Sequence, residues 1–433
     1  LGNQIVFTVA EVVPGLAIKF RVDALGMLFA LVASLLWIIT SAYSIGYMRE
    51  LKEHSQTRYF CFFALALSAT IGVAFSANLL TLYLFYEMLS LATYPLVTHH
   101  QDREARSSGR KYLLYIVGTS IGIVLPAMLI CYHLTGTLEF APRGFMAGAA
   151  TPLTTAVLVF MFIFGFAKAG IMPLHAWLPA AMVAPTPVSA LLHAVAVVKV
   201  GVFSIARVLT GVFGVDLLSG LHLGTMVCYV AGFTVIAASL IALSQDGLKR
   251  RLAFSTIGQL SYIVLGVALL SPKGMTGGLT HIAMHAFGKI TLFFCAGAIF
   301  VATGTKYISE MKGIGKRMPI TMAAFFIGSL SVIGLPPTGG FFSKWYLVQG
   351  TLEAGQPIML IILLVSSMLN AAYFLPIAYN AFFCSPEKAM FGNEIQEAPL
   401  WCVVPPVITA AGSVCLFFYP TVFLRLAEMA VGL

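Results

Sequence analysis

Residues 165–199, GFAKAGIMPLHAWLPAAMVAPTPVSALLHAVAVVK, decide how the rest of the chain is interpreted. They place Lys168 and Lys199 in an apolar segment that prolines interrupt, among them Pro173 and Pro179. Proline removes a backbone hydrogen-bond donor and clashes with the preceding turn, so a helix would be broken here. A lysine at the centre of a membrane-spanning helix costs about 2.5–3.5 kcal/mol. Cations and helix breakers in one apolar segment therefore indicate an ion or substrate site.

The composition excludes a soluble globular protein. Of the 433 residues, 59% are hydrophobic and only 9% are charged, which is too little charge to cover the surface of a soluble domain. Apolar runs of about 20 residues, the length that crosses a bilayer, recur along the chain. We predict an all-α polytopic membrane protein, with one membrane domain over residues 1–433 and about twelve spans, near residues 24–47, 59–77, 79–98, 111–134, 152–180, 187–209, 222–245, 250–271, 276–303, 318–351, 357–383 and 400–423.

A second interruption lies in GLPPTGGFFSKW, where Pro336 and Pro337 follow one another. Broken helices at matching positions of two halves are the best sequence indication of a transporter site. Pro173 and Pro336 are 163 residues apart, as are Tyr59 and His222, the starts of the second and seventh spans. We therefore predict two five-helix repeats, residues 59–209 and 222–383, followed by a C-terminal helix in residues 400–433. Five is an odd number, so the second repeat would be inverted.

The basic residues predict the orientation in the membrane. Most of the Lys and Arg residues in the connections follow odd-numbered spans, for example Arg49, Arg58, Arg103, Lys249 and Lys316. By the positive-inside rule these loops are cytoplasmic, in a multi-pass protein of the cell inner (cytoplasmic) membrane. The net charge of +9 therefore reflects topology, and no basic stripe interleaved with aromatic residues indicates a nucleic-acid partner.

Glu87 is the acidic residue that lies clearly within an apolar span, in LYLFYEMLSLATYPL. We predict that it pairs with Lys168, because a buried ammonium tends to lose its proton unless a carboxylate is near. The pair would act as a switch, in which Lys168 releases its proton when Glu87 is neutralised or moves away. The alternative is a static bridge between helices, although buried ion pairs are poor stabilisers.

His281, His285 and Lys289 lie at i, i+4 and i+8 in HIAMHAFGK. Residues at this spacing drift by only about 40° per step around a helix, so the three share one face. They would extend over about 12 Å and could form a proton wire. A lone histidine would instead be interpreted as a hydrogen-bonded core residue.

The remaining candidates are less well defined by the sequence. We assign Lys199 to the relay and Lys344 to its last protonatable stop, with snorkelling of Lys344 to the membrane interface as the alternative. His193 lies about 120° around the helix from Lys199 and is either a packing or a gating residue. Several polar side chains could order bridging waters, namely Ser189, Ser255, Gln259, Tyr262 and Thr280. His175, just past the first break, is interpreted as a cap or loop contact, and His54, His99 and His100 in the charged loops as solvated side chains.

No cofactor or metal site is predicted. The seven cysteines form no C-x-x-C pair, and the chain contains no Rossmann fingerprint or P-loop. A redox enzyme that holds haem itself is disfavoured, because His281 and His285 are one turn apart on one helix rather than facing each other across a haem. An organic-solute transporter is disfavoured by a path composed largely of lysine and histidine. A structural scaffold would have no reason to bury four lysines.

The chain resembles the antiporter-like proton-conducting subunits that Mrp-type cation/proton antiporters, complex I and membrane-bound hydrogenases share. The motifs that carry the resemblance are FYEMLSLATYPL, residues 168–203, LKRRLAFSTIGQLSY, HIAMHAFGK and GLPPTGGFFSKW. The resemblance implies fourteen helices in two inverted repeats, so two helices would precede Leu1. It also implies a coupling role for Glu87 and Lys168 and a hydrated central path through Lys199, His281, His285, Lys289 and Lys344.

Two assignments within the family stay open. Chain length and the lysine in VVKVGVF look most like the D-type subunit of a Mrp-type Na⁺/H⁺ antiporter. The alternative is a proton-pumping membrane-arm subunit of complex I or of a membrane-bound hydrogenase, which would make the chain part of an ion-translocating oxidoreductase without redox chemistry of its own. Either assignment implies other antiporter-like and small membrane subunits as partners. Both imply protons as the transported ion, and whether sodium is transported as well stays open.

Overall fold

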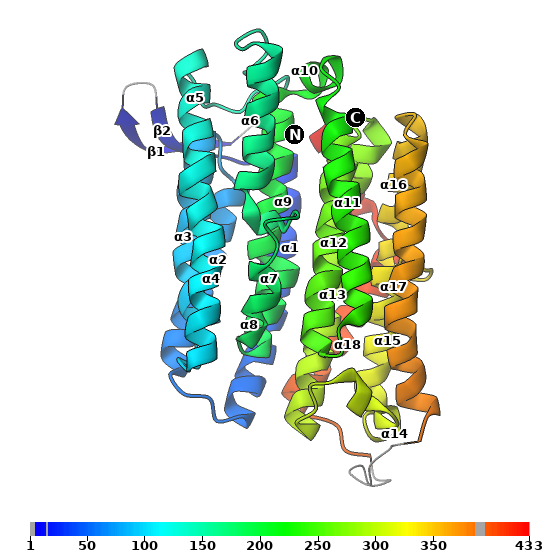
Figure 1. Ribbon diagram of the computed structural model, residues 1–433. Coiled ribbons are helices and arrows are strands. Elements are labelled where there is room, and N and C mark those ends of the chain that lie inside the picture. Colours follow the sequence, from blue (N-terminus) through cyan, green and yellow to red (C-terminus); the bar gives the residue numbers. More distant parts are fainter. Residues whose placement is uncertain (1–4, 14–15, 386–394, 433) are drawn as a thin grey trace.

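The computed structural model describes residues 5–13, 16–385 and 395–432, except for the side chains of residues 13, 192 and 193. These ranges form a bundle of long helices with a small β-hairpin at one end (Figure 1). Within them, nine helical segments are long and apolar enough to cross a membrane. They are α1 (Ala24–Glu50), α2 (Gln56–Ala74), α3 (Leu79–Val97), the continuous segment Arg103–Thr135 that contains α4 and α5, α11 (Leu223–Ser244), α12 (Leu248–Ala268), α13 (Pro272–Thr303), α17 (Pro357–Phe383) and α18 (Leu400–Phe418).

The other three predicted spans, at residues 152–180, 187–209 and 318–351, are divided into shorter pieces. The first contains α6 (Pro152–Gly165), a 3₁₀ turn η2 (Ala167–Ala169) and α7 (Trp177–Ala180). The second contains α8 (Thr186–Ala190), a π-helical turn η4 (Leu191–Val195) and α9 (Val197–Val208). The third is divided into α15 (Pro319–Ile333) and α16 (Gly339–Glu353). The prediction of a polytopic helical membrane protein with two broken helices is therefore confirmed, and the segment after the first break is divided as well.

The β-hairpin was not among the predicted elements. It consists of β1 (Val6–Val13) and β2 (Leu16–Arg21), which pair antiparallel with Phe7 opposite Phe20. Both strands are rich in the β-branched and aromatic residues that favour extended structure. The amide of Arg21 donates to the carbonyl of Phe75 at 2.7 Å, and the amide of Ala77 donates to the carbonyl of Lys19 at 3.0 Å. These bonds attach the hairpin to the connection between α2 and α3.

The first break keeps its freed backbone groups satisfied. After α6, the chain turns through Gly170, whose φ of +71° lies in the left-handed region. The indole of Trp177 donates to the carbonyl of Ala167 at 2.9 Å, and the amide of Met172 donates to the hydroxyl of Thr234 on α11 at 3.2 Å. Non-helical backbone is tolerated at membrane depth when it is buried in protein and satisfied in this way.

The second break is shorter and is closed by small residues. Gly334 follows α15 with a φ of +90°, and α16 begins five residues later at Gly339. A Cβ atom on Gly340 would lie 1.8 Å from the carbonyl oxygen of Ser331, so only glycine allows the two helix ends to approach this closely. A cis peptide bond precedes Pro173 in the first break and Pro337 in the second.

The two ends of the bundle differ in what they carry. In Figure 1 the connections between α1 and α2, between α3 and α4 (Arg103–Thr119), and around α14 (Ile314–Arg317) lie at the lower end. The hairpin and α10 (Val215–Gly220) lie at the upper end, where the chain termini are also marked. The connections that follow the first, third and ninth predicted spans thus lie at the same end of the bundle.

Candidate ion pathway

The four lysines within the spans are all buried. Lys168, Lys199 and Lys289 are 0% exposed, and Lys344 is 8% exposed. The alternative that Lys344 snorkels to the membrane interface is therefore wrong. A buried charge is costly unless it is paired or hydrogen-bonded, so the partners of each ammonium group define the site.

Lys168 lies in the 3₁₀ turn at the first break and reaches α3. Its Nζ donates to the carbonyl oxygen of Tyr86 at 2.6 Å and to the hydroxyl of Ser90 at 2.8 Å. It also lies 3.2 Å from the centroid of the Tyr86 ring, a cation–π contact. Neither Tyr86 nor Ser90 is among the residues predicted from the sequence, although both flank Glu87 within one turn of α3.

Glu87 is half-buried and does not touch the Lys168 ammonium. The ion pairs found among the described residues do not include these two side chains. One carboxylate oxygen, Oε1 of Glu87, is buried without a hydrogen-bond partner. Adjacent residues of a helix point about 100° apart, so a lysine seated on Tyr86 and Ser90 does not meet Glu87 directly. The direct ion pair that the sequence predicts is thus absent from this part of the structure, and the two charges interact at longer range.

Lys199 and His285 connect the two predicted halves of the chain. Lys199 on α9 places its Nζ 2.7 Å from Nδ1 of His285 on α13, although the residues are 86 positions apart in sequence. Both side chains are buried. A nitrogen–nitrogen distance of this length is a hydrogen bond, so an ammonium group can donate directly to a neutral imidazole.

His285 continues toward His281 on the same face of α13. The two rings are stacked, with centroids 5.7 Å apart and planes at 29°. Nδ1 of His281 lies 2.7 Å from the hydroxyl of Ser343 on α16, and Nε2 lies 3.0 Å from Oε1 of Gln259 on α12. The predicted shared face is therefore present, and Gln259 is a direct partner of it. Ser343 was not predicted.

Lys289 shares this helix but faces different partners. Its Nζ donates to the hydroxyl of Ser255 at 2.8 Å and to the carbonyl of Leu252 at 3.3 Å, both on α12. It lies 5.4 Å from the centroid of the Phe374 ring on α17. Lys289 thus lies next to the histidines as a side branch. The spacing predicts instead that it is the third member of the same proton wire.

Lys344 ends this series of residues at the second break. Its Nζ donates to the carbonyl of Ile333, the last residue of α15, at 2.8 Å and to the hydroxyl of Ser367 on α17 at 3.1 Å. It lies 4.8 Å from the centroid of the Tyr262 ring, which is itself 5.7 Å from the ring of His281. The break therefore supplies the carbonyl that holds the ammonium group.

The secondary candidates have local contacts. The hydroxyl of Ser189 donates to the carbonyls of Ala184 and Pro185 at 3.4 and 3.5 Å, within its own turn. His193 lies in the π-helical turn η4, and its side chain is outside the described residues. His175 has its Nδ1 3.2 Å from the carbonyl of Pro173, which agrees with the predicted loop contact.

A cavity of about 890 Å³ lies between the connection after α1, the first break and the start of α12. Its lining includes Glu53 of that connection, residues of the first predicted half such as His100, His175 and Pro179, and Lys249 of the second half. The cavity gives the first break access to one end of the bundle. Its described lining residues include none of the four buried lysines.

These features define the class of protein. Residues 76–370, which contain every member of the path, match the family described as NADH:quinone oxidoreductase/Mrp antiporter, TM. The chain belongs to this family of transmembrane subunits.

Relatives in the family come from three kinds of complex. NADH-quinone oxidoreductase subunit N of Desulforudis audaxviator is 36% identical over 85% of this chain and 74% of its own length. Hydrogenase-4 component B of Escherichia coli K12 is 32% identical, over 91% of this chain and 61% of its own. The A-type subunit of the Na(+)/H(+) antiporter of Alkalihalophilus pseudofirmus is 30% identical, over 95% of this chain and 54% of its own. The chain thus spans less than two thirds of the second and third relatives.

Two solved structures have the same fold. The Mrp complex from Dietzia sp. DQ12-45-1b contains a chain that aligns with all of this one at a TM-score of 0.87, covering 87% of its own length at 23% identity. The membrane-bound sulfane sulfur reductase, described as an archaeal respiratory membrane complex, contains one with a TM-score of 0.88, covering 86% of its own length at 26% identity. Both are multisubunit membrane complexes. This chain has the fold of an integral membrane subunit of such a complex.

Proposed function

We propose that this chain is a proton-translocating, antiporter-like subunit of a multisubunit membrane complex. The observation that carries the proposal is the 2.7 Å contact between Lys199 and His285. It joins two titratable groups that are fully buried and lie on helices from different halves of the chain. A purely structural core has no need for such a contact, because apolar residues of similar volume usually stabilise at least as well.

The proton passes along the path by alternating donation and acceptance. The Lys199 ammonium gives a proton to Nδ1 of neutral His285, and the resulting imidazolium can release one from Nε2. That Nε2 atom and the hydroxyl of Thr280 are buried without a protein partner, and buried groups of this kind are normally satisfied by water. Water there would carry the proton toward His281, whose Nδ1 can receive it through the hydroxyl of Ser343 while its Nε2–H donates to Oε1 of Gln259.

The second break receives the proton at Lys344. Its Nζ donates to the carbonyl of Ile333 and to the hydroxyl of Ser367. The ring of Tyr262 lies between His281 and Lys344 and is close to both. In this proposal, Pro336 and Pro337 end α15 early enough to expose the carbonyl, and Pro173 and Pro179 perform the corresponding task beside Lys168.

Glu87 and Lys168 control the path in this proposal. The carboxylate favours the charged ammonium through space without touching it, so a small displacement of α3 changes the affinity of Lys168 for its proton. Two inverted repeats, residues 59–209 and 222–383, would place this switch in the first half and the exit lysine in the second.

The finer assignment is the D-type subunit of a Mrp-type Na⁺/H⁺ antiporter, in the inner (cytoplasmic) membrane with the loops after odd-numbered spans in the cytoplasm. Lys199 in VVKVGVF supports it. The alternative is a membrane-arm subunit of complex I or of a membrane-bound hydrogenase, which the oxidoreductase and hydrogenase relatives support equally. Copurifying subunits distinguish these assignments: only other antiporter subunits for Mrp, flavin and iron–sulfur subunits for complex I, and a nickel subunit for hydrogenase.

Lys199→Ala tests the pathway itself. Loss of a relay group should lower proton transport by the complex in proteoliposomes about 100-fold or more, measured with a pH-sensitive dye. Lys273→Ala is the matched control, because Lys273 lies in the first turn of the same helix as His285 and is exposed. Full transport by an assembled Lys199→Ala complex would remove the mechanism.

A further inference from the structure

Four residues from two separate connections lie together at the lower end of the bundle. Glu53 and His54 belong to the connection between α1 and α2, and His99 and His100 follow α3. The sequence predicts that the three histidines are solvated. The structure corrects this for His99, which is 1% exposed, whereas His54 is 50% exposed.

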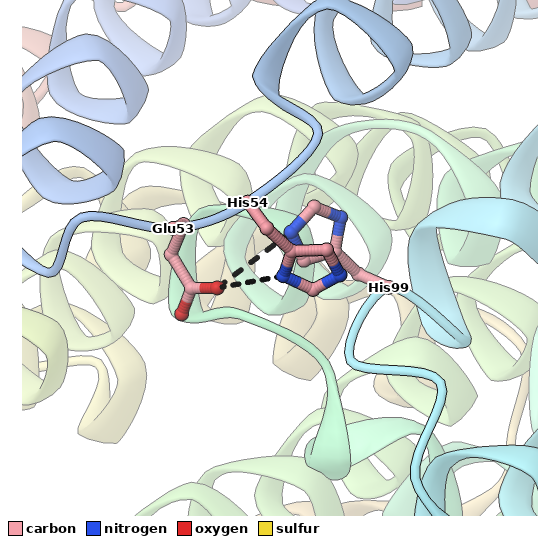
Figure 2. A group of neighbouring side chains, drawn as sticks. All are labelled: Glu53, His54 and His99. Atoms are coloured by element: carbon pink, nitrogen blue, oxygen red, sulfur yellow. Dashed lines mark ion pairs between the residues drawn. The ribbon is translucent and has the colours of Figure 1, made fainter.

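Three of these side chains aim ligand atoms at one point. Nδ1 of His54 and Nε2 of His99 lie 3.9 and 3.7 Å from the same oxygen of Glu53, as Figure 2 shows. The ligand atoms of the three residues all lie within 4.8 Å of one another. Nδ1 of His100 approaches the same oxygen at 3.7 Å but is not part of this set of three.

The cluster is not explained as an ordinary hydrogen-bonded group. Neither ring nitrogen of His99 has a hydrogen-bond partner, although both are buried. A distance of 3.7 Å from the Glu53 carboxylate is too long for a hydrogen bond. Buried polar atoms without partners are rare, and a bound ion is one of the recognised reasons for them.

Two of the three residues, Glu53 and His99, are held in place by their contacts. The carbonyl of His99 accepts a hydrogen bond from Arg58 at 3.2 Å, and its ring packs edge-on against Tyr59 with centroids 5.8 Å apart. The amide of Glu53 donates to the carbonyl of Met48 at 2.9 Å. Ligands that are fixed before binding make a site specific and tight.

We propose that Glu53, His54 and His99 form a binding site for a zinc-class divalent cation. Two imidazoles and one carboxylate are a ligand set that Zn²⁺ uses, with a fourth position open to water. Calcium and magnesium prefer oxygen ligands throughout. Tetrahedral ligands about 2.0–2.1 Å from zinc lie about 3.4 Å apart, so the two imidazoles need to approach the Glu53 oxygen by only a few tenths of an ångström. The half-exposed His54 has the freedom to move toward the ion.

The site lies at the edge of the large cavity. Glu53 and His100 both line this cavity, as does His175 of the first break. A bound ion would tie the connection between α1 and α2 to the end of α3, the helix that carries Glu87. Binding itself does not depend on the proposed transport function and is tested without it.

The experiment measures Zn²⁺ binding to the purified chain in its complex, by competition with a chromogenic zinc chelator. His54→Gln and His99→Gln should each weaken one site at least about 10-fold, because even partners of metal ligands contribute about 10–100-fold to affinity. His133→Gln is the matched control, since His133 is an exposed histidine at the end of α5 (Leu125–Thr135). X-ray absorption at the zinc edge should show two imidazole nitrogens and one carboxylate oxygen.

Two results would overturn the proposal. One is wild-type zinc affinity in both His54→Gln and His99→Gln, which would leave a histidine–glutamate cluster without a metal. The other is an equal loss in His133→Gln, which would show scattered surface binding. If His99→Gln does not fold, His54→Gln decides, because a side chain that is half-exposed in a loop can be replaced without disturbing the core.

Discussion

Each helix break holds a buried lysine through the same kinds of contact, but only one of the two lysines has a carboxylate nearby. Lys168 donates to the carbonyl of Tyr86 and the hydroxyl of Ser90, beside the Tyr86 ring. Lys344 donates to the carbonyl of Ile333 and the hydroxyl of Ser367, near an aromatic ring of α12. One carbonyl, one hydroxyl and one aromatic face thus satisfy an ammonium group in each half.

The difference between the two lysines is the carboxylate. Glu87 adjoins the partners of Lys168. By contrast, α16, which carries Lys344, and α12, α15 and α17, which contact it, contain only one carboxylate, Glu353 at the far end of α16. In the proposed pathway, the neighbouring charge tunes Lys168, whereas Lys344 serves as a proton stop. Three sets of substitutions test this distinction.

Lys168→Ala and Lys344→Ala should have the largest effects. Each removes a proton carrier or its control group, so transport should fall about 100-fold or more, while assembly remains because alanine leaves no buried charge behind. Transport in proteoliposomes and native gel electrophoresis measure the two quantities. The control is Lys316→Ala, at an exposed position in α14. If both lysine variants kept full transport, neither helix break would take part in proton conduction.

Glu87→Gln should have an intermediate effect that separates a switch from a static bridge. We expect transport to fall about 10-fold or more, since a loss of about 1.4 kcal/mol of interaction with the Lys168 ammonium changes its proton affinity by a factor of about 10. The unfolding temperature should change little, because Glu87 does not contact Lys168. A large loss of stability with unchanged transport would instead favour the static bridge, and Glu310→Gln, an exposed carboxylate in η6 (Ile308–Met311), is the control.

Ser90→Ala and Ser367→Ala should have the smallest effects and should match each other. Each removes one hydrogen bond to a charged group, a loss of about 1.5–3 kcal/mol. The free energy of unfolding measured with a denaturant should fall by similar amounts in both variants. A much larger loss for one of them would show that the two lysines are not held equivalently.

Part of the candidate site could be predicted from sequence alone. The shared face of His281 and His285 follows from helical spacing, and Gln259 follows from its polarity within an apolar span. Lys289 has the same spacing but faces Ser255 and Leu252 instead. The serine partners could not be predicted, because Ser90, Ser343 and Ser367 have the same local sequence properties as serines that merely cap turns. Glu87 and Lys168 were expected to touch, since opposite charges in lipid attract, but the carbonyl of Tyr86 occupies the position that Glu87 was expected to take.

The β-hairpin and the histidine cluster were likewise not predicted from the sequence. The hairpin lies outside the apolar spans, where hydropathy gives no information about structure. His99 looks solvated beside its charged neighbours, yet it is buried because the connection between α1 and α2 covers it. The burial of His99 is not encoded by its immediate neighbours, whereas the β-branched and aromatic residues of the hairpin favour extended strands.

The sequence by itself determined where the chain crosses the membrane, where two helices break and which side chains carry charge into the bilayer. These properties follow from hydropathy and proline, whose energies act within a few residues. Only the tertiary structure decided which partner each charge meets, such as His285 for Lys199 across 86 residues of sequence. Hydrogen bonds and ion contacts require separations of a few ångströms, and packing between distant helices sets those separations.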